Sequence, residues 1–181
     1  MKSLRYYFED FGCKPTRTKM SRNLSRLSPV VRLEGIVEHG FGRGSKTLGF
    51  PTANLNADSS PSLREFLGSE ACHDGIYMGW VSLPSYHEPY RAAVSVGTNP
   101  SFEDSTIRLL EAHLIDYKGP DFYNASVRIL LCAFIRESYK FESMDELITA
   151  IQADCDFATH WFTHDDALFS LNHDQFLRNS N

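Results

Sequence analysis

Apolar and polar residues alternate in short segments over most of the chain after Pro29, and turn residues separate these segments. Five segments have the pattern of strands: 30–38, 75–83, 90–97, 107–116 and 125–136. In the last of them the apolar side chains recur at every second position, and we expect them to share one face: Val127, Ile129, Leu131, Ala133 and Ile135. Because a period of two is that of a half-buried strand, the pattern predicts an antiparallel barrel or sandwich.

The period changes near the C-terminus. Apolar residues there recur at spacings of three and four, which is the stripe of an amphipathic helix over 143–162: Met144, Ile148, Ile151, Cys155, Ala158 and Phe162. Ser143 and Glu146 form a capping box at its start. We expect a shorter helix over 61–67 and a tail over 163–181 that includes a short helix. The fold class is therefore mainly β, with a long C-terminal helix against the β domain.

Composition places the chain among globular proteins. It has 181 residues and 20.6 kDa, with 42% hydrophobic and 23% charged residues, enough for one domain with a core. No segment has the ~20 apolar residues that a membrane helix needs. The four cysteines are widely spaced, and Cys132 and Cys155 lie in apolar segments. We therefore expect buried free thiols and a cytoplasmic location. We also expect a monomer.

Charge is distributed unevenly. Residues 1–28 hold seven basic and two acidic residues, whereas 29–181 hold 11 basic and 21 acidic ones. We interpret 1–28 as a basic, mobile extension and 29–181 as the folded domain, with organellar targeting by the arm as the alternative. The acidic body argues against a basic nucleic-acid binder, so phosphate chemistry here needs local cations and a metal.

Glycine is concentrated in one stretch. Five of the eleven glycines lie between Gly35 and Gly49, together with the cations Arg43 and Lys46. Such a loop either holds a phosphate chain with its N–H groups and lysine or forms a wide turn. A Walker A loop is excluded by Ser45, which occupies its second required glycine, and the dinucleotide G-x-G-x-x-G pattern also fails.

The residues after the glycine stretch offer oxygen ligands. Pro51 stiffens the chain, and Thr52 and Asn54 stand two positions apart, on one side of an extended segment. A hydroxyl and an amide carbonyl suit Mg²⁺ that is shared with phosphate oxygens and water. The alternative is a turn that carries polar side chains.

Glu111 is a carboxylate within an apolar strand-like segment, where an unpaired charge is costly. Two interpretations stay open. The carboxylate forms an ion pair with an arginine such as Arg128 or Arg136, or it is a general base whose surroundings tune its pKa.

Taken together, these motifs resemble the riboflavin kinase family of the monofunctional, eukaryotic type. The most specific motif is Gly-Phe-Gly-Arg-Gly-Ser-Lys-x-Leu-Gly-x-Pro-Thr-Ala-Asn over 40–54, and further matches follow in the family's order. They are Gly75-Ile-Tyr-x-Gly79, Val94-Ser-Val-Gly97-x-Asn99-Pro100, Glu111-x-His113, Asp121-Phe-Tyr123, Phe134-Ile-Arg136 and Phe141. The resemblance covers about 31–162 and implies a six-stranded Greek-key barrel with a C-terminal helix. It implies transfer of the γ-phosphoryl group of ATP to the ribityl 5′-hydroxyl of riboflavin, which gives FMN and ADP.

The resemblance also implies roles for particular residues. Glu111 is the catalytic base, and Thr52 and Asn54 hold the divalent cofactor, Mg²⁺, with Zn²⁺ or Mn²⁺ as alternatives. Flavin is bound by Arg136 and Phe141. ATP is bound by Gly40, Gly42, Lys46, Thr52, Leu114, Asp116 and Tyr123. The chain departs from the family pattern at 137–140, where Glu-Ser-Tyr-Lys replaces a Pro-Glu-Lys-like stretch.

Three alternative hypotheses for the function of the chain follow from the sequence. A β-barrel that binds flavin or nucleotide without catalysis needs no combination of Thr52, Asn54 and Glu111. A nucleic-acid-binding barrel that uses the basic arm lacks a basic and aromatic strand face. His160 and His164 have helical spacing for zinc, but a solvated pair is favoured. We expect Asp154 and Asp156 on the solvated side of the helix.

Overall fold

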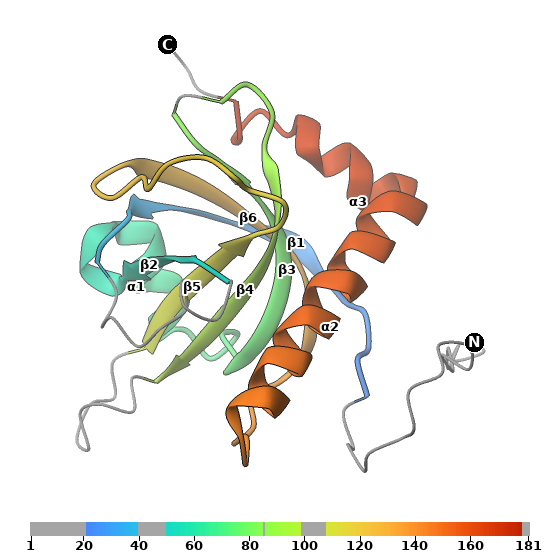
Figure 1. Ribbon diagram of the computed structural model, residues 1–181. Helices are drawn as coiled ribbons and strands as arrows, with labels where there is room; N and C mark the ends of the chain where they lie inside the picture. Colours follow the sequence, from blue (N-terminus) through green and yellow to red (C-terminus); the bar gives the residue numbers. More distant parts are fainter. Residues whose placement is uncertain (1–20, 40–49, 85, 99–107, 179–181) are drawn as a thin grey trace.

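The computed structural model describes residues 21–39, 50–84, 86–98 and 108–178 (Figure 1). Its six strands form one antiparallel sheet in the order β1-β6-β3-β4-β5-β2. The strands are β1 (Ser25–Ile36), β2 (Thr52–Asn56), β3 (Gly75–Ser82), β4 (Tyr90–Thr98), β5 (Arg108–Leu114) and β6 (Ser126–Glu137). The helices are α1 (Pro61–Gly68), α2 (Met144–His164) and α3 (Asp166–Ser170), with 3₁₀ turns η1 (Ala57–Ser59) and η2 (Leu171–His173). The predicted mainly β architecture with a long C-terminal helix is confirmed.

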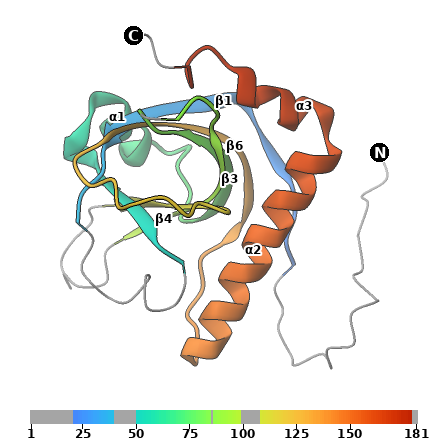
Figure 2. The ribbon, with the colours of Figure 1, turned by 45° about the horizontal axis from the view of Figure 1, so that its top comes forward.

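The sheet curls until its two edge strands meet (Figure 2). Glu38, just beyond β1, forms a bridge with Asn54 of β2, and the Glu38 N–H donates to the Asn54 carbonyl oxygen at 2.9 Å. The enclosed core is built from one face of every strand and from the apolar side of α1, which packs against it. Its fully buried members include Leu33, Leu55, Leu63, Tyr77, Val94, Leu110 and Ile129.

A second apolar cluster lies outside the barrel, where α2 crosses the sheet (Figures 1 and 2). Trp80 of β3 packs at 4.5 Å, between ring centroids, on Phe162 of α2, and its indole N–H donates to the Leu168 carbonyl oxygen. The predicted cap is present, because the Ser143 hydroxyl accepts from the Glu146 N–H at 3.2 Å. The Glu146 carboxylate in turn accepts from the backbone N–H of Glu142.

The face of β6 changes along its length, which corrects one expectation. Leu131 points into the barrel, as predicted, but Ala133 and Ile135 belong to the outer cluster under α2. The pairing of β6 with β3 shifts at Cys132, because Met78 is opposite Ala133 while its neighbour Gly79 is opposite Leu131. A β-bulge of this kind inserts one residue and reverses the alternation beyond it. A second shift lies at Ile135, because Tyr77 is opposite Phe134 while Ile76 is opposite Arg136, and it returns Arg136 to the outer face.

The N-terminal boundary differs from the one that composition suggested. β1 begins at Ser25, inside the segment interpreted as a mobile extension. Leu24 packs against the outer cluster, and Leu27 packs against the barrel core. The Asn23 N–H donates to the Ile135 carbonyl oxygen. Apolar contacts therefore hold the last residues of the basic segment in place.

The cysteines of the described residues, Cys72, Cys132 and Cys155, are buried and free, as expected for the latter two. Burial raises the pKa of the Cys132 and Cys155 thiols to about 12. None of the described helices combines the length and the apolar character that spanning a membrane would take.

Candidate active site

Strand register aligns the residues of interest in one row across the outer face of the sheet. Asn54 of β2 is opposite Glu111 of β5, Glu111 is opposite Ser95 of β4, Ser95 is opposite Ile76 of β3, and Ile76 is opposite Arg136 of β6. Directly paired residues point to the same face. Since neighbouring strands lie about 4.8 Å apart, Glu111 and Arg136 are separated by about 14 Å along this row.

The next row along the same face contains the second predicted oxygen ligand. Thr52 is opposite His113, and His113 is opposite Ala93. Helix α2 covers Ala93 but leaves the β2 and β5 end of both rows partly exposed. Thr52, Asn54 and Glu111 are therefore brought together at the open edge of this face.

Thr52 and Asn54 fit a divalent cation that is shared with phosphate. The Asn54 side-chain amide donates to the Thr52 carbonyl oxygen at 3.4 Å. Among the described residues there is no group of three or more His, Cys, Asp and Glu side chains that could hold a metal. Two neutral oxygens suit Mg²⁺ that takes its other ligands from phosphate and water.

The arginines suggested as partners of Glu111 bind elsewhere. Arg128 donates to the carbonyl oxygens of Phe176 and Arg178. Arg136 donates to Asp154. The described hydrogen bonds of these two side chains thus serve the C-terminal segment and α2.

Arg136 forms a buried ion-pair cluster. Its Nη2 atom lies 2.6 Å from Asp154 Oδ2, and its Nε atom lies 2.9 Å from Oδ1. Arg22, from the basic N-terminal segment, donates from Nε to the same Oδ1 at 2.7 Å. Asp154 is only 2% exposed, so the expectation of a solvated Asp154 is wrong. Two arginines compensate the buried carboxylate, which makes its burial tolerable.

Aromatic side chains stand beside this cluster, in the segment that departs from the family pattern. The Arg136 guanidinium lies 4.9 Å from the ring centroid of Tyr139, and the Tyr139 ring packs 4.3 Å from Phe141. Arg136 and Phe141, both predicted to bind flavin, are therefore joined through Tyr139. Sequence reasoning assigned no role to Tyr139.

The two residues predicted to bind the nucleotide on and just after β5, Leu114 and Asp116, lie in different environments. Leu114 is 4% exposed and faces the barrel core, so its side chain does not reach the surface. Asp116 follows in a turn with φ 63° and accepts from Arg91 Nη2 at 2.9 Å. Asp116 is solvent-exposed and remains available to a ligand.

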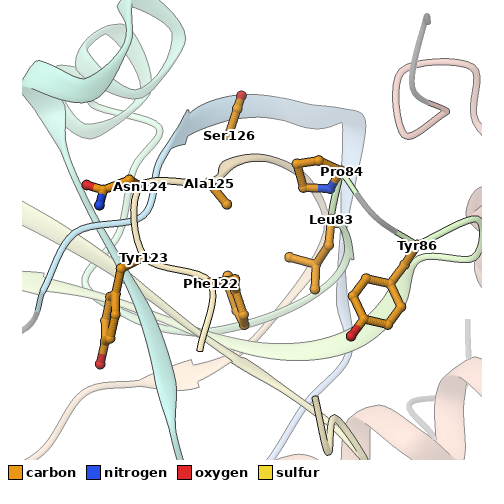
Figure 3. A pocket seen from close by; sticks show the side chains of 8 residues that line it. All are labelled: Leu83, Pro84, Tyr86, Phe122, Tyr123, Asn124, Ala125 and Ser126. Carbon is orange, nitrogen blue, oxygen red and sulfur yellow. The ribbon is translucent and has the colours of Figure 1, made fainter. Parts of the chain in front are cut away.

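Tyr123 borders a pocket at one end of the barrel. The pocket has a volume of about 450 Å³, and Figure 3 shows the segment 122–126 on one side of it and Leu83, Pro84 and Tyr86 on the other. The Tyr123 ring stacks on His39 with centroids 3.7 Å apart. His39 lies three residues beyond the end of β1, so the pocket lies close to the chain that leaves β1.

The glycine-loop residues predicted to bind ATP (Gly40, Gly42 and Lys46) lie outside the described residues. The chain leading to them is anchored twice, at Glu38 and at Val37. The Glu38 carboxylate accepts from the Asn56 amide at 2.5 Å. The backbone of Val37 exchanges hydrogen bonds with Asn124 and Ala125.

Two features of the site were missed by sequence reasoning. Asp154 has a detectable signal, because it stands four residues from both Ala150 and Ala158 on the buried stripe of α2. His113 was noted only as part of a motif. Burial lowers its pKa, against opposing contributions from the Pro51 carbonyl and Asp116, which favours the neutral ring.

These features define a class: a small β-barrel protein with an oxygen-rich, partly exposed site beside a carboxylate. The riboflavin kinase (Flavokinase) family model matches residues 27–162. Riboflavin kinase of Pyricularia oryzae is 40% identical over 141 residues, which cover 70% of this chain and 68% of that protein. The structure of riboflavin kinase from Trypanosoma brucei has a TM-score of 0.62 at 28% identity and matches 83% of this chain and 90% of that one.

A structure titled macrolide-efflux protein, from Streptococcus pneumoniae, has a TM-score of 0.58 at 32% identity. The match covers 73% of this chain but only 39% of that longer one. The chain belongs to the riboflavin kinase family, and the predicted family is confirmed.

Proposed function

We propose that this chain transfers the γ-phosphoryl group of ATP to the ribityl 5′-hydroxyl of riboflavin, with Glu111 as base and a divalent metal on Thr52 and Asn54. The observation that carries the proposal is the pairing of Asn54 with Glu111 in the register of β2 and β5. It supports a base placed beside the metal and phosphate ligands, as phosphoryl transfer requires. Family membership supports the substrates.

In this proposal Glu111 orients the 5′-hydroxyl and accepts its proton as the new O–P bond forms. The bond from Pγ to the bridging oxygen breaks, and ADP leaves with that oxygen. Thr52 and Asn54 would hold the divalent metal, which would neutralise charge on the phosphate oxygens. Lys46 and the backbone N–H groups of the glycine stretch add positive charge on the nucleotide side.

The two substrates are assigned to different parts of the site. Riboflavin lies with its ribityl chain at Glu111 and its ring system toward Arg136 and Phe141. The pocket beside Tyr123 takes the nucleoside part of ATP, because it is lined mainly by apolar and aromatic side chains and Tyr123 stacks on His39 beyond β1. The enzyme acts as a cytoplasmic monomer, with Asp116 as a further contact on the nucleotide side.

The test is an assay of purified protein with riboflavin, ATP and Mg²⁺, with FMN and ADP separated by chromatography. We expect metal-dependent FMN formation that stops when EDTA is added. Asn54→Ala removes a metal ligand, and we expect it to raise the Mg²⁺ concentration needed for half-maximal rate. Flavin binding without FMN formation in the presence of any divalent metal would instead indicate a flavin-binding module.

Glu111→Gln tests the base. It keeps the size and packing of the side chain, so we expect an unchanged melting temperature and a kcat lower by roughly 10²–10⁴-fold. Glu34→Gln makes the same change in charge on the exposed surface of β1 and serves as the matched control. A Glu111→Gln enzyme with the kcat of the control contradicts the assignment of Glu111 as base.

A further inference from the structure

His113 makes a hydrogen bond that reaches out of the β-ladder. Its Nδ1 atom lies 2.9 Å from the carbonyl oxygen of Pro51. A carbonyl oxygen only accepts hydrogen bonds, so the proton is on Nδ1 and the ring donates. Pro51 stands immediately before the first residue of β2, where the backbone pairing with β5 ends.

The hydrogen bond to the Pro51 carbonyl matters because the next residue is Thr52, a predicted metal ligand. The Pro51 carbonyl and the Thr52 nitrogen belong to one planar peptide unit. Holding the carbonyl therefore orients the backbone from which the Thr52 side chain projects. Thr52 is also the direct pairing partner of His113, so backbone and side chain of His113 constrain the same residue.

The imidazole is itself held in place. The Phe50 ring packs edge-on against it, with centroids 5.3 Å apart and an interplanar angle of 73°. On the sheet, His113 stands between Thr52 on β2 and the buried Ala93 on β4. A ring that already packs against Phe50 loses less freedom when it makes the hydrogen bond, which suits it to fix a neighbour.

We propose that His113 is a positioning residue of the phosphotransfer site: its Nδ1–H holds the Pro51–Thr52 peptide so that the Thr52 hydroxyl faces the metal and phosphate next to Glu111. The proposal rests on the proposed role of Thr52. It gives the third residue of the Glu-x-His motif a function different from that of Glu111, because His113 touches the ligand segment and not the reacting atoms.

Two substitutions test whether the position of the N–H donor is what matters, because each replaces the ring by an amide. Asn carries its amide N–H the same number of bonds from Cα as Nδ1, whereas Gln carries it one bond further away. We therefore expect His113→Asn to keep most of the activity. We expect His113→Gln to lose about 10- to 100-fold in kcat/KM for Mg·ATP, because a misplacement of ~1 Å at a reacting centre costs ~10²-fold.

The readout must distinguish positioning from folding. We expect the two variants to have similar melting temperatures and the native KM for riboflavin, while only His113→Gln needs more Mg²⁺ for half-maximal rate. Equal activity of the two variants, whether high or low, overturns the proposal. So does a His113→Gln variant whose activity falls only in proportion to its folded fraction.

A measurement without catalysis checks the hydrogen bond itself. Nitrogen NMR of the imidazole, assigned by its absence in His113→Asn, should show the proton on Nδ1 at neutral pH. A proton on Nε2 alone overturns the proposal. If the native protein forms no FMN, the proposed function fails, and this measurement still decides whether His113 holds Pro51.

Discussion

Asp154→Asn is a substitution that the structure predicts to be strongly destabilising. The carboxylate of Asp154 is almost completely buried, and it accepts hydrogen bonds from Arg22 and from two nitrogens of Arg136. The Arg136 side chain is 6% exposed and the Arg22 side chain 15%. An asparagine has the same shape but no charge, so it leaves the Arg136 guanidinium buried without a counter-charge.

The magnitude follows from that uncompensated charge. Removing one partner of a buried ion pair costs about 3–5 kcal/mol. A change of 1 kcal/mol shifts the melting temperature of a chain of this size by roughly 2–4 °C, so the expected fall is roughly 6–20 °C. The total stability of a domain is about 5–15 kcal/mol, so the variant should still fold at low temperature.

The assay is chemical unfolding followed by tryptophan fluorescence, because Trp80 lies in the cluster between β3 and α2. Arg64→Gln is the control: it breaks a pair with Asp58 whose side chains are 63% and 91% exposed, and we expect a loss below about 1 kcal/mol. If Asp154→Asn unfolds within 1 kcal/mol of the native protein, Asp154 does not compensate a buried charge, and the reasoning is refuted.

Two further predictions concern the C-terminal elements. Ser143→Ala removes the cap of α2 and should lower stability by about 1 kcal/mol, measured by urea unfolding against Thr149→Ala on the same helix. The hydrogen bond from Arg32 is the main cause that lowers the pKa of Asp174 below its ordinary value of 3.8. The stabilising effect of this carboxylate is therefore complete above pH 3.8 and is lost as the pH falls through the lowered pKa. Asp174→Asn should be less stable than the native protein at pH 7, and the difference should disappear in strong acid; a difference that does not change with pH contradicts this.

The strands with clear alternation were predictable because each buries one face of its own local pattern. The segment of β2 has only five residues after a proline, and its identity as a strand depends on pairing with β5. The bulge at Cys132 likewise depends on the register with β3. Local periodicity contains no information on such partners, so the alternation was extended too far along β6.

The candidate site was predictable in its parts but not in its assembly. The spacing of Thr52 and Asn54 was enough to place them on one face. Their closeness to Glu111 comes from strand register between distant segments. The burial of Asp154 was missed for the same reason, because an aspartate on a helix is normally solvated unless arginines elsewhere in the chain compensate it.

The proposed flavin contact of Arg136 is compatible with its ion pair. A guanidinium has five N–H donors. Two nitrogens are engaged with Asp154, and Nη1 donates to the Glu137 carbonyl oxygen. Both Nη1 and Nη2 carry another N–H, so a flavin that reaches this buried side chain could be bound without breaking the ion pair with Asp154. This makes its structural and binding roles separable in one variant.

The double substitution Arg136→Met with Asp154→Leu separates them. Replacing both partners of a buried pair by apolar residues is often neutral or stabilising. Arg22 loses its carboxylate partner in this variant but is more exposed than Arg136, so the variant should regain part of the stability that Asp154→Asn loses. If Arg136 also binds flavin, the KM for riboflavin should rise about tenfold, the loss of one hydrogen bond to a charged group, while the KM for Mg·ATP stays unchanged. A stable double variant with the native KM for riboflavin would limit Arg136 to its role in holding α2 on the sheet.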